Sequence, residues 1–330
     1  MKSNKTLLSF TIPCYRSTKT LPAVVEEIDM RVKALGNYDY EIIAVNDCSP
    51  DDTWQTIQQL CEKNPRIKAI NLAKNVGKHG ALMASYSVVS GDIVIGVDDD
   101  GQCPLDQLEA LIAPLYNGYD MAMAQYPKKK QSGFKNFGSK VNDFMVRFLI
   151  GKPKGLVFSN FIARKRFVCD EIIKYTNPYP YLEGLTLRTT HNIALVPMEE
   201  RDRTAGQSGY NLKKSLALWV NGCTAFSVTP LRLATVLGVL FAIIGFAAGV
   251  FVILQKIITP SVQAGYTSLM AVMLFLGGII MLLLGLIGEY IGRIYICIND
   301  APQYVIRETR NLLPRTGELV RDEALFESVK

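Results

Sequence analysis

The sequence predicts an α/β domain built on a mostly parallel sheet, followed by an interfacial amphipathic helix and a two-helix transmembrane hairpin. Over the first 130 residues, short apolar stretches alternate with stretches of helical periodicity, which is typical of a parallel sheet covered by helices on both faces. Residues 233–288 carry a single charge, at Lys256, and are long enough for two membrane spans. Elsewhere about a quarter of the residues are charged, as in an ordinary globular domain.

The elements of the first domain follow from their patterns in chain order. Short apolar runs rich in β-branched residues predict strands at 7–13, 40–47, 67–72, 92–100 and 120–125. Apolar residues recurring every three to four positions predict helices between them, at 21–35, 53–63, 80–90 and 104–116. Ligands of such sheets bind at the carboxyl ends of the strands, so the residues that follow each strand are the candidates for a site.

An acidic run follows the fourth predicted strand. Residues 98–102 read Asp-Asp-Asp-Gly-Gln, and the second strand also ends in an acid, Asp47. Adjacent carboxylates repel one another, so the run predicts a cation as partner. Alternate residues of an extended chain point the same way, so Asp98 and Asp100 can share a target while Asp99 faces away. Two carboxylates together with substrate phosphates suit Mg²⁺ or Mn²⁺; the alternative is a solvated acidic turn ahead of a helix.

Composition excludes several other chemistries. With two histidines, His79 and His191, a multi-histidine zinc site is excluded. The seven cysteines are scattered without a C-x-x-C pair, which indicates reduced thiols in a cytosolic compartment. No G-x-G-x-x-G follows the first strand, which argues against a dinucleotide-binding domain.

The membrane segment predicts an integral protein of the cell (inner) membrane. Spans are expected at about 231–255 and 267–288, joined by a short connection. Basic residues flank the hairpin on both sides: Lys213, Lys214 and Arg232 before it, and Arg293, Arg307 and Arg310 after it. By the positive-inside rule, the catalytic domain and the C-terminus are both expected in the cytoplasm. No secretion signal is expected, because the first apolar run is short and ends at Pro13.

These patterns divide the chain into four parts. A cytoplasmic catalytic domain is expected at 1–210, two transmembrane helices within 230–290, and a cytoplasmic tail at 291–330. Between domain and hairpin, residues 211–229 place apolar side chains on one helical face, which predicts a juxtamembrane amphipathic helix. The alternative for that segment is an ordinary helix packed on the catalytic domain.

Several motifs resemble glycosyltransferase family 2, whose catalytic domain has a GT-A-type, Rossmann-like fold. "IPCYRSTKTLPAVVEEI" is similar to the family's "IPxYNExxxLxxxxxxI", and "YEIIAVNDCSPDDT" to "YEIIxVDDGSxDxT". "NLAKNVGKHGALMAS" is similar to "NxGxxxAxxxG", and "DIVIGVDDDGQCP" to "DxDxQxxP". "RTAGQSGYNLKK" resembles the "RxxGxSKYxxxK" of polyprenyl-phosphate sugar transferases, a subgroup with a two-span hairpin. That subgroup includes undecaprenyl-phosphate glucosyltransferases, 4-formamidoarabinose transferases and dolichol-phosphate mannose synthases.

The resemblance implies an enzyme that transfers a sugar from a nucleotide-diphosphate sugar, expected to be UDP-linked, to polyprenyl phosphate at the cytoplasmic membrane face. The reaction is expected to be metal-dependent and inverting, and to serve cell-envelope glycan modification or glycolipid synthesis. The implied metal ligands are Asp98, Asp100 and Gln102, and the implied catalytic residues Asp98, Asp100 and Arg203. The positions implied to bind donor or acceptor are Pro13, Tyr15, Asp47, Asn75, Gly77, Asp99, Gln102, Lys128, Ser208 and Tyr210. The resemblance also implies a homo-oligomer, a tetramer in relatives, and no nucleic-acid partner.

The chain departs from the family pattern in four places, one of which is "QYPKKK" at 125–130, where relatives often have arginines. Asn46 and Cys48 replace the Asp and Gly of "DDGS", and Gly209 replaces the Lys of "SKY". "SNFIARKR" at 159–166 replaces "GDFRLMDR", so the usual acid is absent. These departures leave two alternatives open: a membrane glycosyltransferase for another lipid or polysaccharide, and a catalytically inactive scaffold that binds nucleotide sugars.

Overall fold

The computed structural model describes residues 5–126, 156–199, 201, 229–258, 265–299 and 301–312. The chain forms two compact units. The first comprises Met1–Gln131, Gly155–Gly209 and Pro302–Lys330, and the second comprises Ser132–Lys154 and Tyr210–Ala301. The chain therefore leaves the first unit before the two apolar helices and returns to it after them.

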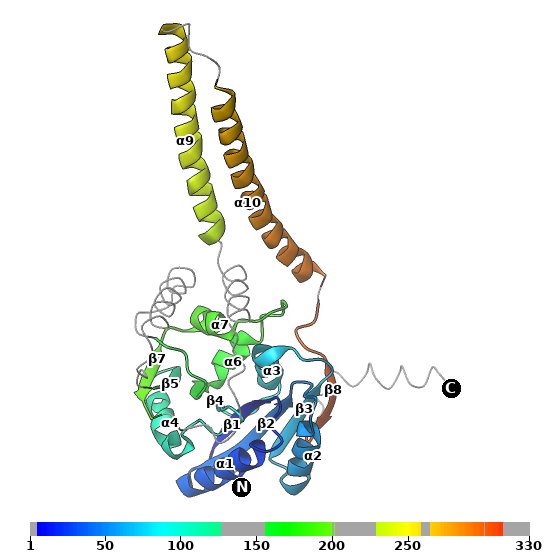
Figure 1. The fold of residues 1–330 in the computed structure, drawn as a ribbon. Helices are drawn as coiled ribbons and strands as arrows, with labels where there is room; N and C mark the ends of the chain where they lie inside the picture. Colours follow the sequence, from blue (N-terminus) through cyan, green and yellow to red (C-terminus); the bar gives the residue numbers. More distant parts are fainter. Residues whose placement is uncertain are drawn as a thin grey trace, which may run out of the picture. The chain divides into compact units, whose positions relative to one another are not determined.

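The first unit is built on a mixed, mostly parallel sheet (Figure 1), as the sequence predicts. Its eight described strands are β1 (Thr6–Cys14), β2 (Tyr38–Asn46), β3 (Ile67–Leu72), β4 (Ile93–Gly96), β5 (Met121–Gln125), β6 (Ile162–Lys165), β7 (Ile193–Pro197) and β8 (Ile306–Arg310). They lie in the order β7-β5-β6-β4-β1-β2-β3-β8. β6 runs antiparallel to β4 and β5, and β8 runs antiparallel to β3, while the other neighbouring strands are parallel.

Helices cover both faces of this sheet. On one face lie α1 (Leu21–Leu35), α2 (Thr53–Lys63) and α4 (Leu108–Tyr116), the last preceded by a 3₁₀ turn at Leu105–Gln107. On the other lie α3 (Gly77–Tyr86) and α6 (Arg166–Ile172), and α7 (Leu182–Thr189) packs against α6.

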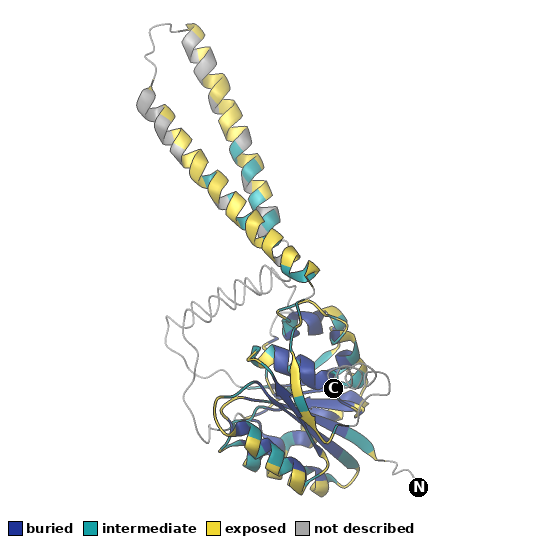
Figure 2. Ribbon diagram, turned by 90° about the vertical axis from the view of Figure 1, so that its right-hand side faces the viewer, coloured by how far each residue is buried: buried dark blue, intermediate teal, exposed yellow. Residues whose placement is uncertain are grey.

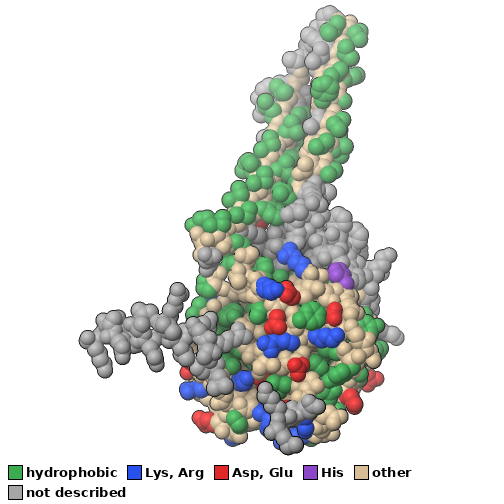
Figure 3. Space-filling model, turned by 180° about the vertical axis from the view of Figure 1, so that it is seen from behind, with side chains coloured by type: hydrophobic (Ala, Val, Ile, Leu, Met, Phe, Trp, Pro, Cys, Tyr) green, Lys and Arg blue, Asp and Glu red, His purple; other side chains and the backbone are tan. Residues whose placement is uncertain are grey.

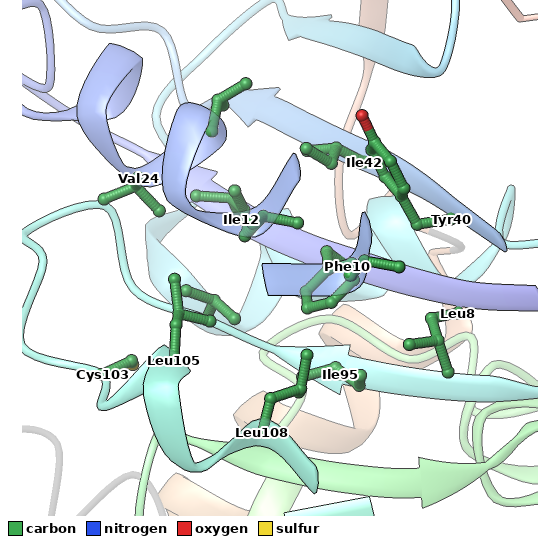
Figure 4. Packing of buried hydrophobic residues seen from close by; sticks show 14 of the residues in the cluster. Leu8, Phe10, Ile12, Val24, Tyr40, Ile42, Ile95, Cys103, Leu105 and Leu108 are labelled. Atoms are coloured by element: carbon green, nitrogen blue, oxygen red, sulfur yellow. The ribbon is translucent and has the colours of Figure 1, made fainter. Parts of the chain in front are cut away.

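The main hydrophobic core lies between the sheet and α1, α2 and α4. Figure 4 shows Leu8, Phe10 and Ile12, alternate residues of β1, packed with residues of the neighbouring strands and of these helices. Because alternate strand residues face opposite ways, the residues between them, Ser9 and Thr11, face α3 and are buried as polar groups. The core thus anchors the central strands whose carboxyl ends carry the predicted site residues.

The predicted elements match closely where the apolar pattern is strong. The helices at 21–35 and 53–63 and the strand at 67–72 have the expected bounds. β4 ends at Gly96 rather than at residue 100, because the acidic run that follows forms a turn. α3 begins at Gly77 rather than at residue 80, and the Asp47 carboxylate accepts hydrogen bonds at its start. The expected tail at 291–330 contains β8, a strand that the sequence did not predict.

The second unit contains two long apolar helices, α9 (Thr229–Ile258) and α10 (Tyr266–Ile298). The predicted spans lie within them, and stretches at Ala234–Phe251 and Phe275–Ile298 have the length and composition to cross a membrane. The described side chains of these stretches are exposed or half-buried (Figure 2), and hydrophobic groups run along their surface (Figure 3). An apolar surface of this extent is typical of a segment covered by lipid, so the unit is a membrane-associated hairpin.

Candidate active site

The predicted donor-site residues gather at the carboxyl edge of the central strands. The turn after β1 contains Tyr15, the loop after β2 begins with Asp47, and the turn after β4 contains the acidic run 98–102. β1 pairs with both β2 and β4, so these three segments follow adjacent strands. Hydrogen bonds hold them together: the Asp47 backbone N–H donates to the Cys14 carbonyl at 3.0 Å, and the Tyr15 backbone N–H donates to Asp99 at 3.2 Å.

Asp47 joins the end of β2 to the start of α3. Its Oδ1 accepts a hydrogen bond from the backbone N–H of Val76 at 2.7 Å, and its Oδ2 accepts one from Gly77 at 2.9 Å. The Asn75 side chain donates to the Asp47 backbone carbonyl at 3.0 Å. Burial raises the pKa of Asp47, and these backbone bonds offset part of the increase. The structure therefore brings together Asp47, Asn75 and Gly77, and Asp47 also satisfies N–H groups that a helix start leaves free.

Asp99 faces the turn after β1, whereas Asp98 is bound by other groups, which are described below. The run forms a turn rather than the extended chain on which the sequence argument relied, so a common target of Asp98 and Asp100 stays a prediction. Asp99 Oδ2 accepts hydrogen bonds from the Tyr15 backbone N–H at 3.2 Å and from the Ser17 hydroxyl. Burial raises the pKa of Asp99, and the negative charges of Asp98 and Asp100 raise it further. The contacts of Asp99 thus hold the Tyr15 turn, while its predicted contact with substrate stays a prediction.

Asp98 has two partners that the sequence did not single out. Its Oδ1 accepts a hydrogen bond from the Lys78 ammonium at 2.5 Å, and its Oδ2 accepts one from the Asn160 amide at 2.6 Å. Lys78 lies in the first turn of α3. Asn160 stands where the family pattern "GDF" has its acid, so the lost carboxylate is replaced by a group that donates to Asp98. The "NVGKHGA" motif and the departure at 159–166 were the available signals for these two residues.

The acidic turn also connects to the segment that leads toward Arg203. Asp100 accepts a hydrogen bond from the Gln102 backbone N–H at 3.1 Å. Two hydrogen bonds of 3.4 Å join Gln102 and Arg201. The Gln102 side-chain amide donates to the Arg201 carbonyl, and the Arg201 backbone N–H donates to the Gln102 carbonyl. The Arg201 guanidinium in turn binds both oxygens of Glu27 at 2.9 and 3.0 Å and also contacts Asp106. Arg201, which the sequence analysis missed, therefore fixes this segment beside the acidic turn.

The acidic turn fits a divalent cation. Its donors are carboxylate oxygens, which Mg²⁺ and Mn²⁺ prefer, and the Lys78 ammonium on Asp98 is itself a bound positive charge. Within the described ranges, no three His, Cys, Asp or Glu side chains are grouped as a ready metal site. A cation here would thus take only two carboxylates from the protein, as is common for Mg²⁺ sites completed by phosphates and water.

Some predicted site residues lie outside the described residues: Lys128, Arg203, Ser208 and Tyr210. The predicted amphipathic helix at 211–229 also lies almost wholly outside them. Pro13, by contrast, lies in β1 opposite Val45 of β2, one residue before the strand ends. The Cys48 backbone has φ of 49°, a left-handed conformation that glycine adopts most readily. This accounts for the glycine that the family pattern has at that position.

Comparison with known families identifies the class of protein. Residues 9–173 match glycosyl transferase family 2, and residues 229–294 match the GtrB C-terminal hairpin. The chain therefore belongs to glycosyl transferase family 2 and is a glycosyltransferase with a GtrB-type hairpin.

Two relatives align along nearly the whole chain. The uncharacterized glycosyltransferase YkcC of Bacillus subtilis is 30% identical over 96% of this chain and 97% of its own. The undecaprenyl-phosphate 4-deoxy-4-formamido-L-arabinose transferase of Klebsiella pneumoniae is 30% identical over 91% of this chain and 92% of its own. The similarity thus extends over both the sheet domain and the hairpin of this chain, and over nearly the whole length of both relatives.

Solved structures agree on the fold. Glucosyl-3-phosphoglycerate synthase of Mycobacterium tuberculosis, solved with uridine diphosphate, superposes with a TM-score of 0.51 at 18% identity, over 67% of this chain and 79% of its own. The same enzyme solved with Mn²⁺, uridine-diphosphate-glucose and phosphoglyceric acid gives 0.50 at 19% identity, over 67% and 78%. At this identity the likeness concerns the fold, and it confirms the predicted GT-A-type architecture.

Proposed function

We propose that this enzyme transfers a sugar from a UDP-linked donor to undecaprenyl phosphate, or a similar polyprenyl phosphate, at the cytoplasmic face of the cell membrane. One observation carries the proposal: an acidic turn at the edge of a family 2 catalytic sheet occurs in the same chain as a GtrB-type hairpin. A soluble acceptor does not require a membrane hairpin, whereas a polyprenyl phosphate presents its phosphate at the lipid surface. The relative from Klebsiella pneumoniae, named for an undecaprenyl-phosphate acceptor, supports this choice.

The chemistry needs few catalytic groups from the protein. A phosphate monoester has a second pKa of about 6, so the acceptor is already largely dianionic at neutral pH. An acceptor oxygen forms a bond to the anomeric carbon as the bond to the nucleoside diphosphate breaks, with inversion and with the electron pair leaving on the diphosphate. No general base is required, which is compatible with Asn160 standing where relatives have an acid. Rate enhancement then comes from positioning and from electrostatic stabilisation of the leaving group.

Separate groups of residues at the carboxyl edge of the sheet would bind the nucleoside and the diphosphate of the donor. The Pro13–Tyr15 turn, Asp47 and the start of α3 would hold the nucleoside of the donor. Asp98, Asp100 and Gln102 would hold a divalent cation, Mg²⁺ or Mn²⁺, which neutralises charge on the leaving diphosphate. We further propose that Arg203 and Ser208 bind phosphate, because a guanidinium matches phosphate oxygens in a bidentate fashion. Lys128 and Tyr210 are proposed as further substrate contacts and a tetramer as the assembly, on the family resemblance alone.

The test is transfer of radiolabel from UDP-glucose to undecaprenyl phosphate by the purified protein in detergent. We expect label in the lipid phase with Mg²⁺ or Mn²⁺ and none with EDTA. A panel of UDP- and GDP-sugars identifies the donor if UDP-glucose is not used. Lipid-linked label that requires no polyprenyl phosphate, or no transfer from any donor of the panel, would contradict the proposed acceptor or activity.

A pair of variants tests the acidic turn. Asp98→Asn and Asp100→Asn are expected to lower kcat by at least about 100-fold, as loss of a group that stabilises developing charge does. The matched control is Asp92→Asn, because Asp92 precedes β4 and its carboxylate contacts the Leu7 backbone N–H at 3.4 Å. Full turnover by Asp98→Asn would exclude the metal mechanism.

A further inference from the structure

A row of polar side chains crosses three neighbouring strands at the edge of the sheet. Asn46 ends β2 and lies opposite Asn71 of β3, which lies opposite Glu308 of β8. Asn46 Nδ2 donates to Asn71 Oδ1 at 2.8 Å, and Asn71 Nδ2 donates to Glu308 Oε1 at 3.1 Å. Both asparagines are buried. The row therefore connects the strand that follows the membrane hairpin to the residue before Asp47.

The hydrogen bonds of the row all run in the same direction. At its inner end, the Ser49 backbone N–H donates to Asn46 Oδ1 at 3.3 Å, so every donor along the row points toward Glu308. A carboxylate can only accept hydrogen bonds, whereas an amide can turn to present either its oxygen or its nitrogen. The carboxylate of Glu308 thus determines which way the two buried amides face. Its other oxygen lies 3.7 Å from the Arg310 guanidinium, on its own strand.

The inner end of the row reaches the donor side of the proposed site. Ser49 Oγ accepts a hydrogen bond from the Arg16 backbone N–H at 2.8 Å and donates to Asp51 at 2.5 Å. Arg16 has φ of 60°, in the left-handed region, and follows Tyr15 directly. The orientation of the Asn46 amide therefore helps to fix Ser49 in the loop after β2 and, through Ser49, the Arg16 backbone in the turn after β1.

We infer that Glu308 is a positioning residue for the nucleotide-sugar donor, acting through Asn71 and Asn46 on the turns that follow β1 and β2. This inference rests on the proposed function, since it takes these turns as the donor site. It also explains why asparagine replaces the family's aspartate at position 46. An aspartate at position 46 would place a carboxylate, which only accepts hydrogen bonds, at both ends of the row. Asn71 Nδ2 could then donate to one of the two carboxylates, while Asn71 Oδ1 would face the other and be repelled by it.

The test compares donor kinetics of five full-length variants, four single and one double, in detergent, with UDP-glucose or the donor found by the sugar panel. For Glu308→Ala we expect the KM for the donor to rise about tenfold, as when one buried hydrogen bond is left unmade, with kcat nearly unchanged. Glu308→Gln keeps an acceptor oxygen and is expected to stay within about twofold of the wild type. Thr309→Ala is the matched control, because this neighbouring β8 residue faces the opposite side of the sheet and is exposed.

The fourth variant tests the direction of the row. Asn46→Asp alone is expected to raise the donor KM about tenfold, because it places acceptors at both ends of Asn71. Adding Glu308→Gln to it supplies a donor at the outer end, and the KM is expected to return to within about threefold of the wild type. A double variant no better than Asn46→Asp, or equal losses in Glu308→Ala, Glu308→Gln and Thr309→Ala, would overturn the inference.

A second readout separates this inference from the proposed function. Hydrogen exchange of the Ser49 and Arg16 backbone N–H groups needs no substrate, and we expect it to be faster in Glu308→Ala but not in Glu308→Gln. If no donor is used but exchange changes as expected, the proposed function fails while the positioning by Glu308 stands. If the wild type transfers sugar and Glu308→Ala changes neither KM nor exchange, the positioning role is refuted and the proposed function stands.

Discussion

Lys78 and Asn160 set the charge felt by Asp98, the first carboxylate of the acidic turn. Lys78 donates to one of its oxygens and Asn160 to the other. The Lys78 ammonium offsets one negative charge. The Asn160 amide is neutral, and because it stands where the family pattern has an acid, no further carboxylate lies beside Asp98 at that position. In the enzyme without a metal, the positive charge of Lys78 reduces the repulsion among the three adjacent carboxylates. A divalent cation that binds Asp98 has to compete with this ammonium.

Removal of the Lys78 charge is therefore expected to tighten metal binding. For Lys78→Met we expect the Kd of the free enzyme for Mn²⁺ to fall about tenfold, since a neighbouring positive charge disfavours a second cation at the same carboxylate. Titration of free Mn²⁺ by electron paramagnetic resonance measures this directly. Lys63→Met, at the exposed end of α2, is the control and should leave the Kd unchanged. An unchanged Kd in Lys78→Met would show that Asp98 is not a metal ligand.

Glu41, which lies outside the site, gives the stability of the fold a pH dependence. Its buried carboxylate accepts hydrogen bonds from Ser9, from Lys68, and from both the backbone and the hydroxyl of Ser90. Burial alone would raise the pKa of Glu41, but the bonds from Lys68, Ser9 and Ser90 outweigh it and lower the pKa below the ordinary value of 4.5. The ionised form therefore stabilises the fold above the unfolded-state pKa, and this stabilisation is lost as the pH falls through the folded-state pKa.

We accordingly expect Glu41→Gln to lower the free energy of unfolding at pH 7 by about 1–3 kcal/mol. The difference from the wild type should begin to narrow as the pH falls below about 4.5, because Glu41 then takes up a proton in the unfolded chain while it is still ionised in the folded protein. Thermal unfolding in detergent between pH 7 and pH 4 measures the two curves. A difference that stays constant over this range would mean that the charge of Glu41 contributes nothing.

The acidic turn and its neighbours were largely predictable from the residues themselves. The sequence located the acidic run at the end of the fourth strand, but β4 ends at Gly96 and the run forms a turn, so the alternation of an extended chain does not apply to it. The partners of Asp98 were not predictable in the same way. Lys78 and Asn160 are 20 and 62 residues distant in sequence from Asp98. They reach the turn because α3 packs on β1 and β2 and because β6, which follows Asn160, pairs with β4.

At the scale of elements, the apolar pattern predicted β1 to β5 and missed β6, β7 and β8, of which β7 and β8 are the edge strands of the sheet. β1, β2 and β3 are near-continuous apolar runs, because both of their faces are covered. β8 reads Ile-Arg-Glu-Thr-Arg and lies at the edge of the sheet. Its pattern of charges resembles a solvated tail, and such charges are typical of edge strands that are protected from further pairing. β6 reads Ile-Ala-Arg-Lys, and two charges in four residues interrupt its apolar run. β7 is apolar, Ile-Ala-Leu-Val-Pro, but it follows residue 125, where the predicted strands ended.

The pairing of β1 with β4 depends on a close approach at Gly91. A Cβ added there would lie 2.6 Å from the Leu7 carbonyl oxygen and 2.9 Å from the Ser9 backbone nitrogen. The Gly91 N–H also donates to Ser9 Oγ at 2.8 Å. The Ser9 Oγ would also lie 2.6 Å from that Cβ. Because two of the three nearest atoms belong to the backbone, a turn of the Ser9 side chain would not make room, and the backbone itself would have to move.

Gly91→Ala is therefore expected to lower the free energy of unfolding by about 1–3 kcal/mol, the usual cost of overpacking. The measurement is thermal unfolding of the full chain in detergent. Gly238→Ala is the matched control, since a Cβ on this glycine of α9 meets nothing within 4 Å. If both variants unfold with the wild type, β4 does not approach β1 as closely as the register requires.

At the scale of the whole molecule, the sheet constrains how the chain can cross a membrane. β7 precedes α9 and α10 in the sequence and β8 follows them, yet both strands belong to one sheet. The hairpin must therefore begin and end on the same side, so the helices either both span the membrane or both stay on its surface. Their length and exposed apolar surface favour two spans, and the basic flanking residues favour the cytoplasm as the side of the sheet.

This topology makes a last prediction about the two ends of the hairpin. Single cysteines placed at Lys19, in the catalytic unit, and at Thr309, in β8, are expected to react with a membrane-impermeant maleimide only after the cells are opened. A cysteine at Ser261, in the sequence between α9 and α10, should react in intact cells, because two spans put that connection on the opposite face.

Ile243→Arg, which introduces a charge near the middle of α9, costs about 2.5–3.5 kcal/mol for insertion and should reduce labelling at Ser261 without exposing Lys19. The control is Ile243→Leu, which should leave all three labelling patterns as they are. Labelling of Thr309 but not Lys19 in intact cells would contradict the pairing of β8 with β3 within one chain, because a strand cannot join the sheet across a bilayer.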